Sequence, residues 1–429
     1  METKYFLEFN TRSPPIAATQ EFFKTLYCTM AFVDLEDHGT LALTAAVVVL
    51  TTIALILGSK RIHRITKSRA ARQKIDELAA NNKEPNEAPT VSSLFVHPVK
   101  SLRAVSVPSA ALDELGLKGD RRLMIVRPCP STASATTDEK TATHRFVTQR
   151  QFPGLTSIEA SLPSTTTETN NMTIITLKSS AVPGSQVNID VSEETLKAHK
   201  QRYRAGIWDD VVTVVDVGDD AASFVKNVLL AVDECGQEPF SGFENIRVVS
   251  IVPDVTVRKT PEEYIPPEAW TVAGSIPNVA LTDGFPILVA CEASLNELNR
   301  RLQQKGKPPI PMSRFRPNIV IRNPGGRPFE EDQWKAIKIG DNTILHMVKG
   351  CPRCKQSCTD QLTGERFEEP IETLADFRAL GKNKEDVYFA QNAVFHGGSG
   401  SGCQIKVGDT VSVLSYGDPV WDLDPVQAE

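Results

Sequence analysis

The sequence is poor in cysteine and has no excess of basic residues, and each shortage removes a class of protein. Its 429 residues include 8 Cys, too few for a small disulfide-bonded scaffold. The 53 acidic and 47 basic residues give a formal charge of −6, which argues against a dedicated nucleic-acid binder. No G-x-G-x-x-G segment lies between a predicted strand and a predicted helix, so a dinucleotide-binding fingerprint is absent. Hydrophobic residues at 41% and charged residues at 23% are typical of a globular chain with two or three structural units.

One long uncharged run, GTLALTAAVVVLTTIALILGS, lies near the N-terminus at residues 39–59. A helix of this length spans about 31 Å, close to the thickness of the hydrocarbon core of a bilayer. A buried core helix or a cleaved signal peptide are the alternatives, but 38 residues with more acidic than basic side chains precede the run. Basic residues follow it, so the sequence predicts a single-pass anchor with the downstream domain in the cytosol, on the mitochondrial outer membrane or the endoplasmic reticulum.

The rest of the chain predicts an α+β fold dominated by short strands, most simply a barrel-like sheet with a few helices. Helices are expected where apolar residues recur at helical spacing, at 219–232, 292–306 with Ser294 as its N-cap, and 372–381. Strands are expected where short β-branched runs lie between turn residues, at 91–102, 121–128, 144–151, 171–179, 315–323, 341–350 and, as two strands around a VGD turn, 402–417.

Three of the cysteines, Cys351, Cys354 and Cys358, lie within eight residues. A structural zinc site needs four ligands, and the sequence contains no second C-x-x-C or H-x-x-x-H type motif to complete one. A thioredoxin-like pair at Cys351 and Cys354 needs a βαβ context, whereas a strand-like segment precedes Cys351 and a turn-like segment follows it. Three ordinary thiols remain possible, as does a soft thiolate on a transition metal whose cofactor supplies the other ligands. A phosphorylated cofactor would need cations, and these occur where predicted strands meet loops: Lys100, Arg121, Arg122, Arg150, Arg314 and Arg316.

Several segments, taken in order, resemble the MOSC-domain proteins and, within them, the amidoxime-reducing branch. FVHPVKSLRAVSV (95–107), LDELGLKGDRRLMIV (112–126) and FVTQRQFPGL (146–155) resemble the N-terminal β-barrel module of this family. ACEASLNELNRRL, FRPNIVI and CPRC with DQLTGE, followed by the KVGD turn (406–409), resemble the MOSC domain itself. The resemblance covers about residues 91–415, and the motifs occur in family order.

This resemblance implies a mixed β-barrel with flanking helices, and the barrel is expected to hold a molybdenum pyranopterin cofactor (Moco). The predicted transmembrane helix precedes this barrel in the chain. The resemblance implies that Cys354, the second cysteine of the C-x-R-C motif, is the protein ligand of molybdenum. It also implies contacts to the pterin or its phosphate from Lys100, Ser101, Arg121, Arg150, Arg316, Asn318 and Arg353. Pro352, Lys355 and Cys358 depart from the family pattern and bear on substrate choice. The expected organisation is an N-terminal extension (1–38), the anchor (39–59), a basic juxtamembrane segment and linker (60–90), the MOSC N-terminal module (91–190), a mixed connecting region (191–280), the MOSC domain (281–415) and a tail (416–429).

The activity implied by the resemblance is the two-electron reduction of N-hydroxylated compounds such as amidoximes and hydroxylamines. Because no dinucleotide fingerprint is present, electrons are expected from a partner protein. The resemblance implies that this partner is a b-type cytochrome fed by its NADH-dependent flavin reductase, and anchoring to membrane lipid would keep the partners on one surface. One alternative is a molybdenum cofactor carrier or sulfur-transfer module without turnover, like the C-terminal part of molybdenum cofactor sulfurases. The PLP-dependent desulfurase domain of those proteins has no counterpart before residue 91 here. A metal-free MOSC scaffold is a third interpretation.

Overall fold

The fold was analysed in a computed structural model, which describes residues 73–74, 77, 88–129, 141–162, 173–232, 243–252, 255–256, 258–271, 274–398 and 402–422. All of these residues belong to one compact unit, Thr66–Glu429. The predicted anchor at 39–59 and most of the basic segment at 60–90 lie outside them. Within the described residues, no helix is long and apolar enough to cross a membrane.

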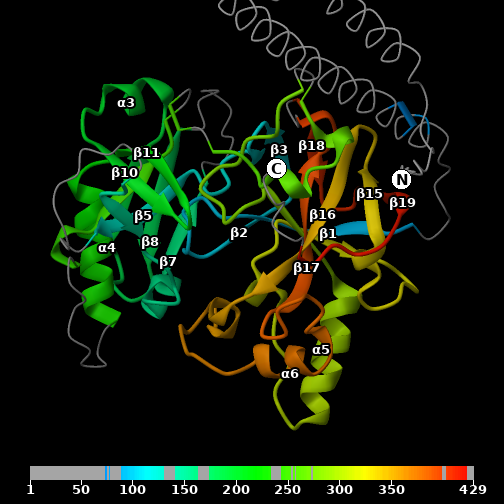
Figure 1. Cartoon of the computed structure of the whole chain (residues 1–429). Helices are drawn as coiled ribbons and strands as arrows, with labels where there is room; N and C mark the ends of the chain where they lie inside the picture. Colours follow the sequence, from blue (N-terminus) through cyan, green and yellow to red (C-terminus); the bar gives the residue numbers. More distant parts are fainter. Residues whose placement is uncertain are drawn as a thin grey trace, which may run out of the picture. The chain divides into compact units, whose positions relative to one another are not determined.

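A closed five-stranded barrel, in the order β10-β11-β12-β5-β6, forms the first half of this unit (Figure 1). Parallel pairing of β6 with β10 closes it. Its strands are β5 (Leu123–Pro128), β6 (His144–Phe146), β10 (Arg202–Ile207), β11 (Asp210–Asp216) and β12 (Arg247–Ser250). The barrel confirms the α+β prediction, but three of its strands come from residues 191–280, where the sequence indicated only a mixed connecting region.

Strand β5 explains how the barrel has two apolar faces. Successive side chains of a strand point to opposite faces. Met124 and Val126 therefore join a core cluster of barrel residues that includes Ala205 and Val214. The alternate residues of β5 join a second cluster that contains helix α4 and lies outside the barrel.

The outer cluster is covered by a helix and a small sheet. Helix α4 (Asp219–Val232) begins with two acidic residues and buries Phe224, Val225 and Val228, which confirms the predicted helix at 219–232. It packs against β9 and β12. The other elements of this layer are β7 (Ile158–Ser161), β8 (Ile174–Ser179) and β9 (Gln186–Asp190). Helix α3 (Glu193–Ala198) packs its Leu196 in a separate small cluster with Val215 and Val252.

An eight-stranded mixed sheet, in the order β19-β15-β16-β17-β13-β14-β1-β2, forms the second half. Its strands are β1 (Thr90–Val96), β2 (Val105–Val107), β13 (Ile287–Cys291), β14 (Ile319–Arg322), β15 (Trp334–Ile339), β16 (Thr343–Arg353), β17 (Val387–Phe395) and β19 (Val411–Tyr416). Helices α5 (Glu292–Gln304) and α6 (Ile371–Arg378) lie together on one face, beside β13, β14 and β17 (Figure 1). Strand β1 thus carries the first residues of the barrel module into the second sheet. A separate three-stranded sheet contains β3 (Ser109–Asp113), β4 (Gly116–Leu117) and β18 (Gln404–Lys406).

Several element boundaries differ from the sequence predictions. The strand expected at 315–323 begins only at Ile319, because the preceding Met312–Phe315 segment is a 3-10 helix, η5. The strand expected to end at residue 350 continues to Arg353, because it pairs with the long β17. Strands β18 and β19 flank the predicted VGD turn but pair with β3 and β15 instead of with each other.

The prediction that Ser294 caps α5 is wrong. The helix begins at Glu292 after Cys291, which makes no side-chain cap. Ser294 is fully buried, and its hydroxyl donates to the Glu331 carboxylate, with 2.6 Å to Oε1 and 2.8 Å to Oε2. Burial and the neighbouring Asp332 raise the pKa of Glu331 to about 7.

This buried carboxyl group makes stability depend on pH in a defined window. The folded chain keeps the Glu331 proton up to about pH 7, whereas an unfolded glutamate loses it near 4.5. The stabilisation is therefore complete below pH 4.5 and is lost as the pH rises through 7, a change of about 3 kcal/mol. Glu331→Gln keeps the neutral form at every pH and does not lose this stabilisation. The difference in free energy of unfolding, variant minus wild type, should therefore rise by that amount between pH 4.5 and 8.

Urea unfolding of both proteins across this pH range measures the difference directly. The buried His97, whose pKa burial and then Arg121 lower to about 3, contributes equally to both curves and cancels. Parallel curves from pH 4.5 to 8 would show that Glu331 is ionised in the folded chain.

Candidate functional site

A pocket lies where loops of the barrel half meet the ends of strands from the eight-stranded sheet. Barrel residues Phe146 and Trp208 line it, together with the segment before β13 and the end of β16. Its lining contains every residue that the sequence assigned to a cofactor or metal: Lys100, Ser101, Arg121, Arg150, Arg316, Asn318, Arg353 and Cys354. Residues separated by up to 254 positions are thus brought together, counted from Lys100 to Cys354.

Backbone strain is concentrated at this pocket. Ser101 (φ 69°), Arg121 (φ 47°), Trp208 (φ 54°) and Arg316 (φ 54°) all adopt the left-handed region. They are four of the six non-glycine residues with positive φ in the described part of the chain. This conformation is unfavourable for residues with a Cβ, and such strained residues cluster at active sites and ligand sites, where the surrounding structure enforces them. Four such residues in one pocket lining make this pocket the candidate functional site, independently of any motif.

The pocket is strongly positive. Among the described residues that line it, Asp283 is the one carboxylate, and it pairs with Lys100 (Nζ to Oδ1, 2.5 Å). The cations of the lining are Lys100, Arg121, Arg150, Arg314, Arg316 and Arg353. Such an excess predicts an anionic ligand with more than one charge.

Among these cations, Arg316 is buried without a carboxylate partner in the described residues. Its side chain is 8% exposed, and its Nη1 donates to the Gln361 carboxamide at 3.2 Å. No carboxylate lies within ion-pair distance of it in the described residues. Burial, and then the nearby Arg121, lower its pKa to about 9.

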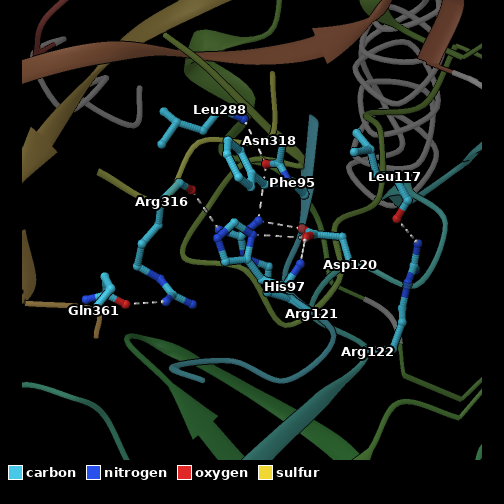
Figure 2. Close-up of polar contacts among 10 residues, drawn as sticks. All are labelled: Phe95, His97, Leu117, Asp120, Arg121, Arg122, Leu288, Arg316, Asn318 and Gln361. Atoms are coloured by element: carbon cyan, nitrogen blue, oxygen red, sulfur yellow. Dashed lines mark hydrogen bonds and ion pairs between the residues drawn. The ribbon is translucent and has the colours of Figure 1, made fainter. Parts of the chain in front are cut away.

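Behind the pocket, a buried polar layer sets the position of Arg121 (Figure 2). Arg121 donates to Asp120 Oδ2 at 2.6 Å and to Asn318 Oδ1 at 3.1 Å. Burial opposes ionisation of Asp120, but the charge of Arg121 and hydrogen bonds from His97 and Arg121 outweigh it and hold the pKa of that carboxyl far below its ordinary value. Because the pKa of His97 is about 3, this histidine is uncharged and its 3.4 Å approach to Asp120 is not an ion pair.

Asn318 lines the pocket, but its side chain is already used within the protein. Its Oδ1 also accepts from the Leu288 amide at 3.1 Å, and its Nδ2 donates to the Phe95 carbonyl at 3.3 Å (Figure 2). Its geometry is that of a residue that joins β1, β13 and Arg121. Arg122, one of the cations picked from the sequence, does not line the pocket, because it points the other way and donates to Asp113 Oδ1 at 2.7 Å.

The three clustered cysteines occupy different environments. Cys354 is exposed on the pocket wall between β16 and the 3-10 helix η7 (Lys355–Cys358), and no hydrogen bond to its Sγ is present in the described part. Cys351 also lines the pocket, and its Sγ accepts from Arg353 Nη1 at 2.9 Å. Cys358 is buried, points its Sγ at the Glu368 carbonyl, and is not part of the pocket wall. Burial raises the pKa of both the Cys351 and Cys358 thiols.

These positions weaken two interpretations of the cluster. Cys351 to Arg353 is extended strand, so the Cα atoms of Cys351 and Cys354 lie about 10 Å apart, too far for a disulfide without backbone movement. Within the described residues, no group of three His, Cys, Asp or Glu side chains could hold a metal ion by itself. A thiolate that needs a separate cofactor and three ordinary thiols are the two interpretations that these observations leave open.

An interlocked pair of carboxamides holds the segment after Cys354 against the barrel. Gln149 donates to Gln361 Oε1 at 3.1 Å, and Gln361 returns a hydrogen bond to Gln149 Oε1 at 3.0 Å. Gln356 donates to the same oxygen at 3.2 Å. Because Gln361 also accepts from Arg316, one buried amide joins the barrel loop, the cysteine segment and the buried cation.

We expect Gln361→Ala to lower the free energy of unfolding by about 1–3 kcal/mol, because it leaves Gln149 and Arg316 with unmatched buried groups. Urea unfolding measures the loss, and amide hydrogen exchange should become faster over 355–361. Gln404→Ala is the matched control, since Gln404 makes an exposed 3.4 Å contact and should change little. Equal, small effects of both substitutions would show that the amide pair does not hold the segment.

Four residues in or beside the pocket were not predicted from the sequence: Trp208 and Asp283 line it, and Gln149 and Gln361 lie outside its lining. Gln149 and Gln361 lie in the motifs FVTQRQFPGL and DQLTGE, but an uncharged amide has no charge or spacing pattern that would single it out. Asp283 precedes a fully buried strand in a TDG turn, a place where a loop carboxylate often has a role. Trp208 stands in a tight turn, where a large aromatic residue is unusual.

Comparison with known families agrees with this architecture. Residues 88–231 match the MOSC N-terminal beta barrel domain, and residues 277–412 match the MOSC domain. The chain is 27% identical over 340 residues to a bovine protein named mitochondrial amidoxime reducing component 2, covering 78% of this chain and 83% of that protein. It is 28% identical over 304 residues to mouse mitochondrial amidoxime-reducing component 1, covering 70% and 74%.

A molybdenum cofactor sulfurase of Aspergillus niger is also similar, with 26% identity over 358 residues. The alignment covers 76% of this chain but 41% of the sulfurase, so the chain spans less than half of that protein. The two family matches together account for most of the described unit, and their order follows the barrel and the eight-stranded sheet. The chain therefore belongs to the MOSC-domain proteins.

Proposed function

We propose that this chain binds a molybdenum pyranopterin cofactor in the pocket and uses it to reduce N-hydroxylated compounds of the amidoxime or hydroxylamine type. The observation that carries the proposal is the exposed Cys354 thiol, without a hydrogen bond in the described residues, on the wall of a pocket with six lining cations. A thiolate is a ligand for a soft or high-valent metal, and cations bind a phosphorylated cofactor. The names of the bovine and mouse relatives support the same reaction.

The residues present fit such a cofactor. Arg316 is buried without a carboxylate partner in the described part of the chain, a costly arrangement unless an anion binds. The Nε atoms of Arg314 and Arg353 are likewise buried and, among the described residues, without a hydrogen-bond partner. Two unmatched arginine donors and one buried arginine without a carboxylate partner in the described residues are what a polyanionic ligand would satisfy.

In this proposal Cys354 holds the metal. Lys100, Ser101, Arg121, Arg150, Arg316 and Arg353 hold the pterin and its phosphate. When bound, the cofactor supplies two-electron chemistry that converts N–OH to N–H and releases the oxygen as water with two protons. The chain itself fixes the thiol at the end of a strand, supplies the positive potential, and keeps Arg121 and Arg316 in place through Asn318 and Gln361.

Electron supply and location complete the proposal. Reducing equivalents would come from a b-type cytochrome and its NADH-dependent flavin reductase. A helix at 39–59 would anchor the chain in the mitochondrial outer membrane or the endoplasmic reticulum, with the pocket in the cytosol. The word mitochondrial in the names of the relatives favours the first membrane.

The test is to produce the full chain in a host that makes the cofactor, then to measure bound metal and pterin. Reduction of amidoximes and hydroxylamines is assayed with a chemically reduced viologen dye as donor, so that the result does not depend on a partner. Near-stoichiometric molybdenum with turnover supports the proposal. Zinc in place of molybdenum, or a folded chain without pterin, would contradict it.

The similarity to a sulfurase supports one competing function, a cofactor carrier or sulfur-transfer module. The same experiment separates the two. Stoichiometric molybdenum and pterin without reduction of any N-hydroxylated compound, together with transfer of the cofactor to an acceptor apoenzyme, would favour the carrier.

A further inference from the structure

Trp208 occupies a position that fold stability does not explain. Ile207 pairs with Asp210, so Trp208 and Asp209 form the two-residue turn of the β10–β11 hairpin. Such turns favour Asn or Gly, because the backbone adopts positive φ, and Trp208 does so with a bulky side chain (φ 54°). The indole is also 46% exposed, which leaves a large apolar surface in water. Exposure alone is ordinary, since other large apolar side chains such as Leu230 are exposed too, but a bulky residue at positive φ on a pocket wall is strained where a ligand would contact it.

The indole is nevertheless held in one orientation on the pocket wall. Its Nε1 donates to Asp283 Oδ1 at 3.1 Å, and the Arg150 guanidinium lies 4.8 Å from its ring centre. Phe146 meets it edge to face, with centroids 5.6 Å apart. An aromatic group fixed by three contacts and still half exposed is a preformed binding surface.

Asp283 adds a hydrogen-bond acceptor beside this surface. Its Oδ1 accepts from both Lys100 and Trp208. Its Oδ2 has no partner in the described part of the chain, and the side chain is 71% exposed. A ligand lying on Trp208 could therefore donate an N–H to Asp283.

We propose that Trp208 and Phe146 form an aromatic shelf that selects substrates with a flat aryl group next to an N–H-bearing N-hydroxylated group. The shelf binds the aryl ring, and Asp283 accepts from the N–H. This inference rests on the proposed function and names the substrate class of the same site. Trp208 is a specificity-determining residue, so its loss weakens binding of aryl substrates and leaves small alkyl substrates nearly unaffected.

The test measures binding and turnover separately on the cofactor-loaded full chain. Isothermal titration compares benzamidoxime with acetamidoxime, which has the same head group without the ring. Trp208→Ala should weaken benzamidoxime binding about tenfold, the effect of one lost aromatic contact with its buried area, and change acetamidoxime less than twofold. Trp208→Phe should retain most of the affinity. Leu230→Ala, which removes another exposed apolar side chain far along helix α4, is the control.

Molybdenum content and thermal unfolding of each variant show whether Arg150 or the fold has been disturbed instead. The inference is overturned if Trp208→Ala weakens both amidoximes equally, if neither is affected, or if the wild type does not prefer the aryl compound. Failure of the proposed function looks different. If benzamidoxime binds through Trp208 but is never reduced, the aromatic shelf is supported and the proposed reductase activity is contradicted. If benzamidoxime is reduced but its binding does not depend on Trp208, the activity is supported and the shelf is contradicted.

Discussion

Cys354→Ala should lose bound molybdenum by more than about tenfold and reduce amidoxime turnover to background, because it removes the one protein ligand assigned to the metal. The fold should survive, since the thiol is exposed and has no hydrogen bond in the described residues. Elemental analysis of the purified full chain measures the metal, and thermal unfolding measures the fold. Activity alone would not suffice, because many substitutions near the pocket could lower it.

Cys351→Ala is the matched control for this experiment. Cys351 lines the same pocket three residues away, but its Sγ is bonded to Arg353 and burial raises its pKa. The Cys351→Ala variant should therefore retain most of the molybdenum that the wild type binds. The reverse pattern, with metal lost from Cys351→Ala and kept by Cys354→Ala, would reassign the ligand. Loss from neither would mean that the cofactor, if present, is held without a cysteine.

Arg378→Ala should lower the free energy of unfolding by about 3–5 kcal/mol, because it leaves a buried carboxylate without its counter-charge. Arg378, at the end of α6, donates to Asp332 at 2.6 and 3.0 Å and to the Tyr388 carbonyl at 2.9 Å. Asp332 is 8% exposed and also accepts from Gln391 at 2.7 Å. The hydrogen bonds to Tyr388 and from Gln391 connect this ion pair, and with it α6, to β17, which pairs with the strand that carries Cys351. Urea unfolding of the full chain measures the loss.

An exposed ion pair provides the comparison. Arg322 donates to Glu292 at 3.0 Å, but its side chain is 63% exposed, so Arg322→Ala should cost about 0–1 kcal/mol. A loss for Arg378→Ala no larger than that would show that water reaches Asp332 and screens it. Replacing both partners with apolar residues of similar volume should cost much less than Arg378→Ala, because no lone charge is left behind.

The sequence predicted the periodic elements well and their partners poorly. Helix α4 and helix α5 were found because apolar spacing and acidic first turns are local properties. The closed barrel was only partly predicted. Strands β10, β11 and β12 form a barrel only because they pair with each other and with β5 and β6, and this pairing is not visible in their local sequence. The mistaken cap at Ser294 has the same origin: its partner Glu331 lies 37 residues away and could not be inferred from spacing.

By itself, the sequence determined the family, the α+β class, and the candidate residues around Cys354. Motifs and charges can be read directly from the order of residues, without knowledge of which segments are in contact. Only the tertiary structure decided which of them meet. It brought Arg316 next to Arg121, turned Arg122 away, buried Cys358, and placed Trp208 and Asp283 on the pocket wall. The physical reason is that strain, desolvation and the absence of a counter-charge arise from contacts between distant segments. Such contacts depend on how the barrel and the eight-stranded sheet pack, which no local pattern encodes.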